Sequence, residues 1–219
     1  MQYQVATDWI INRSFVMSPI THFLASWVGF ERFQASQRDK TLVVIAGIIP
    51  DLDGLGIVVD FATRILGLPE TDYYQSFHRM YGHGLPGAIL IAAAVGMLGI
   101  RRFWVAIWAF ISVHLHLLCD VIGARGTTAE DIWGIYYFAP FTTAYELSWS
   151  GQWPLVGWQN TTISIILLSI LMIRATASGY SPVGLLSQRA DIAFVETLRN
   201  RKKRLLSVFD QKNRRKRAN

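Results

Sequence analysis

The stretch FWVAIWAFISVHLHLLCDVIG, residues 103–123, decides the fold of this chain. It is apolar over about the twenty residues that an α-helix needs to cross a bilayer. Near its end it carries His116 and Asp120, four positions apart. On a helix such a pair shares one face and can hold one metal ion or form one hydrogen-bonded pair, whereas His114 points nearly the opposite way and is expected to be a packed residue. The stretch therefore predicts a membrane helix with a polar site near one end.

Two further apolar runs flank this stretch, at residues 84–100 and 155–173, and the first is slightly short for a membrane span. Arg101 and Arg102 separate the first run from the opening stretch and predict a tight helical hairpin. Arg174 is expected to end the last helix. Together the three runs predict a small, all-α membrane bundle.

Earlier in the chain, residues 18–30 and 41–50 are apolar but too short to cross a bilayer alone, so a packed or re-entrant helix pair is expected there. The composition agrees with a membrane protein, because 52% of the residues are hydrophobic and only 16% are charged, against about 25% charged in globular proteins. A soluble bundle with these runs as core helices stays open.

The net charge of +6 is concentrated at the C-terminus. Residues 189–219 hold eleven Lys or Arg against three acidic residues, which leaves the other 188 residues slightly acidic. We therefore expect two parts, a helical membrane-embedded domain at residues 1–188 and a basic cytoplasmic tail at residues 189–219 that contacts anionic lipid. Nucleic-acid binding is the disfavoured alternative, because no aromatic residues that would stack on bases are interleaved with the basic ones.

All five histidines precede residue 117, and four of them fall in short clusters with aspartates or other histidines. Imidazole and carboxylate together suit a divalent cation. The clusters are separated by up to about a hundred residues along the chain. They comprise His22, then Asp51 and Asp53, then His78 and His83, and finally His116 and Asp120.

The positions of the basic residues predict that these clusters meet. If Arg101, Arg102 and the tail face the cytoplasm, residues 103–123 run outward and residues 155–173 run back. His83 precedes the first helix of the hairpin and Asp120 lies near the end of the second, so both reach the outer end. A second hairpin, with Arg32, Arg38 and Lys40 in its inward loop, would bring His22 and Asp51 to the same end. A metal site at the extracytoplasmic end of the helices is expected.

Taken together, the clusters resemble a family of bacterial membrane-bound proteins assigned as metal-dependent hydrolases, which are also described as LexA-binding, inner-membrane-associated hydrolases. The resemblance covers roughly residues 18–145. Its motifs are Asp-Pro-Leu-Thr-His, Pro-Asp-x-Asp-His, His-Arg-Gly-x-Thr-His-Ser, His-x-x-x-Asp and Pro-Phe before an aromatic residue. They correspond here to Ser18 to His22, Pro50 to Gly54, His78 to Gly84, His116 to Asp120, and Pro140 and Phe141 with Tyr145. The main departure is Gly54, where the family usually has histidine, so one ligand is expected to be missing.

The resemblance implies metal-assisted hydrolysis, with a His and Asp pattern similar to that of the helical zinc-dependent phospholipase C enzymes. The implied cofactor is one or two divalent ions, zinc with manganese as an alternative. We expect Asp53 to act as a ligand, as a partner of a ligand or as general base, and Arg79 to bind a phosphate oxygen or to pair with a carboxylate. The expected metal ligands are His22, Asp51, His78, His83, His116 and Asp120.

These features favour hydrolysis of a phosphoester in a lipid or lipid-linked substrate at the bacterial inner membrane. No serine-hydrolase elbow or phosphate-binding glycine loop is present. Two other classes stay open, a non-catalytic protein with a structural metal and a membrane anchor whose tail recruits a protein or nucleic acid. Residues 126–131 read as a helix start and predict a helical cap over the site. The tryptophans and tyrosines of residues 133–158 are expected to anchor the membrane interface.

Overall fold

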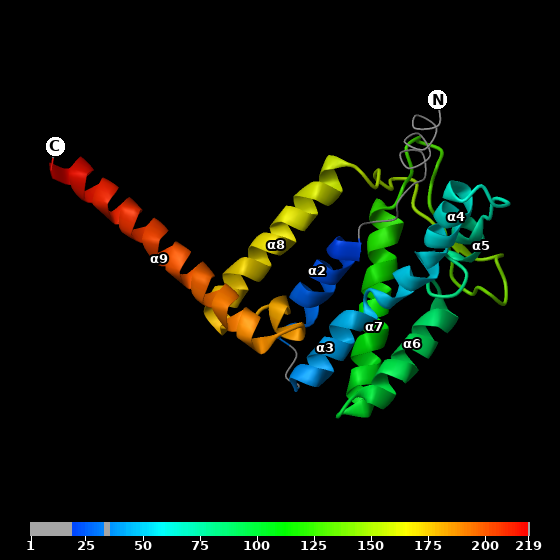
Figure 1. The fold of residues 1–219 in the computed structure, drawn as a ribbon, viewed down its shortest axis with the longest axis horizontal. Coiled ribbons are helices and arrows are strands. Elements are labelled where there is room, and N and C mark those ends of the chain that lie inside the picture. The colour runs from blue at the N-terminus through cyan, green and yellow to red at the C-terminus, as the bar shows by residue number, and fades with distance from the viewer. Residues whose placement is uncertain (1–18, 33–35, 219) are drawn as a thin grey trace. The chain divides into compact units, whose positions relative to one another are not determined.

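The computed structural model describes residues 19–32 and 36–218, and it is mostly helical, which confirms the predicted fold class (Figure 1). Two units emerge, one up to Ile165 and one from Ile166 onward. The boundary expected at residue 188 stays a prediction. The elements are α2 (Pro19–Phe30), α3 (Gln37–Ala46), the 3-10 helix η1 (Ile49–Leu55), α4 (Gly56–Ile65), α5 (Tyr73–Phe77), α6 (Leu85–Leu98), α7 (Arg102–Gly123), β1 (Ile135–Tyr136), β2 (Glu146–Leu147), α8 (Trp158–Ser178), the 3-10 helix η2 (Pro182–Leu185) and α9 (Gln188–Ala218).

The hairpin predicted around the arginine pair is formed by α6 and α7 (Figure 1). A Cβ at Gly96 would lie 2.7 Å from Ala106 Cβ, so the two helices approach closely just before the turn. The turn is held by the buried Asp39 of α3, whose carboxylate accepts hydrogen bonds from the backbone N–H groups of Ile100 and Arg101 at 2.8 and 3.3 Å. A buried carboxylate thus fastens α3 to this hairpin.

Helix α7 lies at the centre of the first unit and contacts α2, α3 and α6. Many of the buried side chains between these helices are small or branched, and Trp27 is a large exception. Gly47, which follows α3, is the tightest point, because a Cβ there would overlap Ser26 Oγ of α2 and lie 2.6 Å from Ser112 Oγ of α7. Buried apolar residues of this core include Trp27, Val43, Val44, Ala88, Val105, Ala109 and Val113.

The short helix pair predicted near the N-terminus is present, with different bounds and two additions. Helix α3 begins at Gln37 rather than at residue 41, because Ser36 Oγ accepts a hydrogen bond from Asp39 N at 3.1 Å and caps the helix. Ser18 lies outside the described residues. After α3 the chain continues as η1 and α4, and the α3 and η1–α4 helices are bent by 47°.

Within residues 19–32 and 36–218, two helices, α7 and α8, are long and apolar enough to span a membrane, and the bent pair of α3 with η1–α4 would make a third. Helix α6 has 14 residues, which is short of a full span. It is shorter than the apolar run that predicted it because Gly84 and Gly99, at its two ends, have extended backbone conformations.

Helix α8 does not end at Arg174, contrary to the prediction, but continues to Ser178. It ends where Gly179 adopts a φ of 79° and donates a backbone hydrogen bond to Ala175 O, an ending that glycine favours. In the second unit, the buried Asp191 of α9 accepts hydrogen bonds from the backbone N–H and the hydroxyl of Ser181. The basic C-terminus is a helix of 31 residues.

Residues 124–157, here called the cap segment, connect α7 to α8 without the helix that was predicted at residues 126–131. Gly126 N instead donates a hydrogen bond to Asp131 O at 2.9 Å and closes a loop. The segment then forms β1 and β2, which pair antiparallel with Ile135 opposite Leu147. The prediction failed because the acidic residues there do not precede an apolar, helical repeat.

Candidate metal centre

Five elements of the first unit bring the predicted ligands to one end of the helices. His22 comes from the first turn of α2, Asp51 from η1, and His116 and Asp120 from the last part of α7. His78 ends α5, and His83 lies in the turn before α6. Side chains of these residues form three overlapping groups in which the candidate ligand atoms lie within 4.8 Å of one another. The groups are His22, His116 and Asp120; Asp51, His83 and His116; and Asp53, His78 and His83.

Three of the histidines have one ring nitrogen committed to an acceptor. His116 Nδ1 lies 2.9 Å from Gly47 O, and a carbonyl can only accept, so this nitrogen carries the proton. His83 Nδ1 and His78 Nδ1 likewise donate to Asp53, at 3.0 and 2.7 Å. In the neutral ring each of these residues therefore presents the lone pair of Nε2, the form in which histidine binds metal.

Four acceptor atoms face one point at the centre of this cluster. His116 Nε2 lies 3.2 Å from His83 Nε2, 3.1 Å from Asp120 Oδ2 and 3.7 Å from Asp51 Oδ1. His83 Nε2 lies 3.6 Å from Asp120 Oδ2 and 3.9 Å from Asp51 Oδ1. In a tetrahedral zinc site with bonds of about 2.0 to 2.2 Å, neighbouring ligand atoms are about 3.3 to 3.5 Å apart. The observed separations bracket this value.

Several buried atoms in and around this cluster have no hydrogen-bond partner. Among the described residues, the buried atoms without a hydrogen-bond partner include Asp51 Oδ2, both carboxylate oxygens of Asp120, His78 Nε2 and both ring nitrogens of His22. Buried polar atoms are normally paired, because leaving one unpaired costs about 1 to 3 kcal/mol. A divalent cation would satisfy several of these acceptors at once, so the residues present fit a metal ion.

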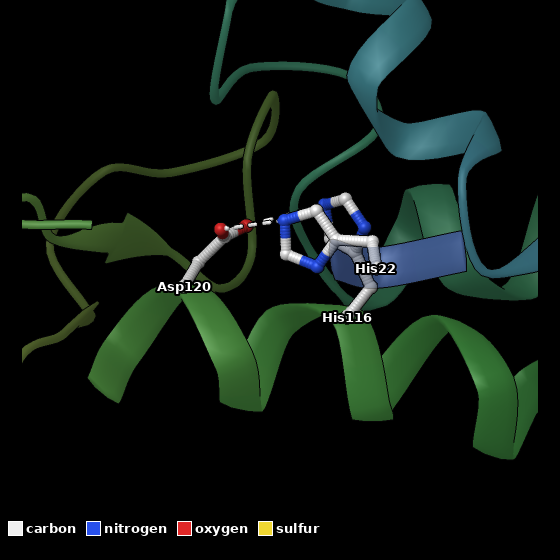
Figure 2. Close-up of side chains that lie close together, drawn as sticks. All are labelled: His22, His116 and Asp120. Atoms are coloured by element: carbon white, nitrogen blue, oxygen red, sulfur yellow. Dashed lines mark ion pairs between the residues drawn. The ribbon is translucent and has the colours of Figure 1, made fainter. Parts of the chain in front are cut away.

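His22 lies against the other carboxylate oxygen of Asp120. Its Nε2 is 3.2 Å from Asp120 Oδ1, and its ring stacks on His116 with centroids 3.8 Å apart (Figure 2). The two oxygens of Asp120 thus face different histidines. This arrangement allows Asp120 to bridge two ion positions, or allows His22 to support a single ion.

Both carboxylate oxygens of Asp53 accept hydrogen bonds from neighbouring residues. Its Oδ1 accepts from His78, and its Oδ2 accepts from His83 and from Gly82 N at 2.9 Å. A carboxylate that donates no lone pair to the centre but orients two histidines is a common support of metal sites. The geometry therefore favours this role for Asp53 over proton abstraction.

Gly54, the departure from the family pattern, is buried beside His78. A Cβ at this position would lie 2.9 Å from His78 Nδ1 and 3.4 Å from Tyr74 Cε2. A histidine at position 54 would therefore displace the ring of His78, whose hydrogen bond to Asp53 needs this space. In this chain the glycine accommodates the His78–Asp53 pair.

Arg79 has the strained backbone that often marks a functional position, with a φ of 92°. Its guanidinium donates to Gly134 O at 3.1 Å and lies over the rings of Trp133 and Tyr136, 5.3 and 5.6 Å from their centroids. In the part of the chain that the structure describes, no carboxylate forms a salt bridge with it. Its predicted role in binding a phosphate oxygen stays a prediction.

His83 and His114 differ in their surroundings. Burial lowers the pKa of His83, against the opposing effect of its hydrogen bond to Asp53, so the ring is neutral near pH 7 and able to bind a metal. His114 lies outside the three ligand groups. It is held by Phe110 O at 2.9 Å and by the hydroxyl of Tyr137 at 3.1 Å.

Three residues that position the site were missed or misjudged from the sequence. Gly47 supplies the carbonyl for His116, but a glycine after an apolar helix is too common to single out. Gln152 is buried, and its amide binds Asp120 O, Val121 O and Trp133 O while its Oε1 accepts from Trp133 N at 2.8 Å. Trp133, expected at the membrane interface, instead packs against His83 with ring centroids 5.4 Å apart.

Comparison with known proteins gives one result. The family model described as YdjM inner membrane protein matches residues 17–196 of the chain. No significant match was found among curated proteins or among solved structures.

Proposed function

Since the chain belongs to the YdjM inner membrane protein family, we propose that it is a metal-dependent hydrolase of the bacterial inner membrane that cleaves a phosphoester of a lipid or lipid-linked substrate. The observation that carries the proposal is the meeting of four acceptor atoms, from His83, His116, Asp51 and Asp120, without a donor among them. The description of the matched family names a location, the inner membrane. Helices α7 and α8, which are long and apolar enough to span a membrane, agree with this location. The site lies at the extracytoplasmic end in this proposal.

The donor set of two imidazoles and two carboxylates suits zinc, with manganese as the alternative. His83, His116, Asp51 and Asp120 would hold one ion, and His22 with Asp120 would hold a second. When bound, a divalent ion lowers the pKa of a coordinated water and polarises the scissile phosphoester.

The residues of the chain supply orientation and charge for this reaction. Asp53 accepts from Nδ1 of His78 and His83, which leaves Nε2 of both rings free and orients His83 Nε2 toward the centre. Arg79 holds a phosphate oxygen through the N–H groups that Gly134 does not use. In the reaction, the water oxygen bonds to phosphorus, the P–O bond to the alcohol breaks, and the proton of the water ends on the leaving alcohol.

A structural metal site is the second candidate, and the burial of the ligands favours it. The side chains of His22, His83, His116 and Asp120 are fully buried, as in sites where a metal only stabilises the fold. Asp51, with 13% of its side chain exposed, offers the more open approach that a catalytic site needs.

Metal analysis combined with activity measurement separates these candidates. The purified full chain, His116→Ala and the matched control His114→Ala would be compared for bound zinc and manganese and for hydrolysis of bis(4-nitrophenyl) phosphate and phosphatidylglycerol. We expect His116→Ala to lose the metal and roughly a hundredfold or more of the turnover, with His114→Ala unchanged. Metal without turnover in the wild type would support the structural candidate, and absence of both would contradict the proposal.

A further inference from the structure

The segments that carry the candidate ligands also expose apolar side chains. In η1, Leu52 and Leu55 are 57% and 56% exposed and alternate with the aspartates. In and beside α5, the rings of Tyr73, Phe77 and Tyr81 follow one another, with centroids 5.6 and 5.9 Å apart, and each ring is at least 40% exposed. Since η1 packs against α5, these five exposed residues lie on neighbouring segments and are here called the apolar rim.

The apolar rim adjoins the most open side of the metal centre. Asp51 is 13% exposed, whereas Asp53 and His78 are at most 7% exposed and the remaining candidate ligands are fully buried. Leu52 is the next residue after Asp51, and consecutive Cα atoms are only about 3.8 Å apart. A substrate that reaches the centre past Asp51 therefore passes the rim.

The rim also continues into a surface suited to lipid. Val58 and Ile65 of α4 are 60% and 67% exposed, and the helices α3 and η1–α4 together are apolar enough for a bent span or a re-entrant segment. Exposed tyrosines beside an apolar surface are typical of the boundary between hydrocarbon and headgroups. A site for a water-soluble phosphoester, or for a structural metal alone, requires no such rim.

We infer that the apolar rim binds the hydrocarbon chain of a membrane lipid and guides its phosphoester to the centre past Asp51. This inference rests on the proposed hydrolase function and adds the route and the part of the substrate that is recognised. The polar headgroup reaches the buried ligands while the hydrocarbon chain remains against Leu52, Leu55 and Phe77.

Kinetic measurement on two substrates tests the inference. Leu52→Ala/Leu55→Ala is expected to lower kcat/KM for phosphatidylglycerol in vesicles roughly tenfold, since each apolar group removed from such a contact weakens discrimination by this order. Hydrolysis of bis(4-nitrophenyl) phosphate and the metal content should stay unchanged. The matched control is Leu90→Ala, a leucine of α6 that is 70% exposed and lies outside the apolar rim. Equal loss on both substrates, or no loss on the lipid, would overturn the inference.

A binding measurement keeps the test valid if no turnover is found. Vesicles of phosphatidylglycerol with a diazirine at the end of one acyl chain would be irradiated with the reconstituted full chain, and the adducts mapped by mass spectrometry. We expect adducts within residues 52–55 and 73–81 that diminish in Leu52→Ala/Leu55→Ala. Such adducts without hydrolysis would retain the lipid site and reject the hydrolase. Adducts confined to α7 and α8 would reject the lipid site.

Discussion

At the residue scale, the hydrogen bonds of Asp53 determine which nitrogen of His78 and His83 is free. The carboxylate accepts from both rings, so both present Nε2. Removing the charge but keeping the shape isolates this effect, because an amide has only one oxygen to accept hydrogen bonds. One of the two rings would then have to turn or change its tautomer.

Asp53→Asn is therefore expected to weaken metal binding about 10- to 100-fold, the usual loss when a partner of a ligand is replaced. Chelator competition on the purified protein measures the affinity. The matched control, Asp72→Asn, changes an exposed carboxylate outside the ligand groups and should bind metal like the wild type. Wild-type affinity in Asp53→Asn would contradict the orienting role.

A second prediction at this scale concerns the contact of Gly47 with Ser26 and Ser112. Gly47→Ala is expected to destabilise the protein by about 1 to 3 kcal/mol, because the added methyl group overpacks a closed interface. It should also weaken metal binding by shifting the carbonyl that orients His116. Thermal unfolding in detergent and metal content provide the two measurements.

The control for this substitution is Gly29→Ala in α2, where the added Cβ would lie 3.7 Å from Leu115 Cδ2, an ordinary contact. Alanine in a helix is more stable than glycine by about 0.5 to 1 kcal/mol. Gly29→Ala should therefore be neutral or stabilising. If Gly47→Ala behaved in the same way, the close packing of α2, α3 and α7 at this point would be wrong.

At the element scale, local sequence patterns predicted the apolar helices. Contacts between residues far apart in the sequence determine the other elements. The α6–α7 hairpin follows from apolar length and the arginine pair, both visible in the sequence. Helix α5 depends on Asp60, whose carboxylate accepts from Tyr73 N and Tyr74 N at 2.8 and 2.9 Å. No local repeat indicates such a contact over thirteen or fourteen residues, so α4 and α5 were not predicted.

The candidate site was likewise predicted from the sequence only in part. The spacing of His and Asp residues identified those that could bind metal, because such clusters can be recognised directly in the sequence. Their tautomers and support depend on Gly47 O, Asp53 and Gln152, which are brought in by the fold. Nor could the sequence indicate that Gly54 leaves room for His78.

Substitution of Gln152 tests how the cap segment is held to α7. Its amide group joins α7 to the cap segment through four hydrogen bonds. Gln152→Leu removes the partner of the backbone N–H and C=O of Trp133, and a buried polar group left unpaired costs about 1 to 3 kcal/mol. We expect faster hydrogen exchange across residues 124–157 and a lower melting temperature. The matched control Gln159→Leu removes an amide whose Oε1 has no hydrogen-bond partner, and it should exchange like the wild type.

At the scale of the whole molecule, we expect charge to determine whether α9 binds the membrane. Arg201, Lys202, Lys203 and Arg204 are exposed, and each basic residue near an anionic leaflet contributes about 1 kcal/mol of attraction. Replacing all four with Gln removes about 4 kcal/mol of this attraction and should weaken contact with phosphatidylglycerol, while retaining the Ser181–Asp191 contact. A polarity-sensitive dye on Leu205→Cys, in a Cys119→Ala background, reports the contact.

The dye should shift to the blue in vesicles that contain phosphatidylglycerol, and high salt should reverse the shift. The control exchanges Arg for Lys and Lys for Arg at the same four positions, which keeps the charge. If the Gln variant retained the shift, apolar contacts rather than charge would hold α9 to the membrane. Retained hydrolysis in the Gln variant would separate the membrane contact from catalysis.

The orientation of the first unit decides on which side of the membrane the metal centre lies. Arg101 and Arg102 occupy the α6–α7 turn, and basic loops stay in the cytoplasm. The opposite end of α7 carries Asp120 and is joined to the cap segment by Gln152.

In a Cys119→Ala background, Val156→Cys, at a position 92% exposed, should react with an impermeant maleimide on spheroplasts. Ile100→Cys, at a position 64% exposed, should react only after permeabilisation. The reverse pattern would place the centre in the cytoplasmic half and contradict an extracytoplasmic substrate.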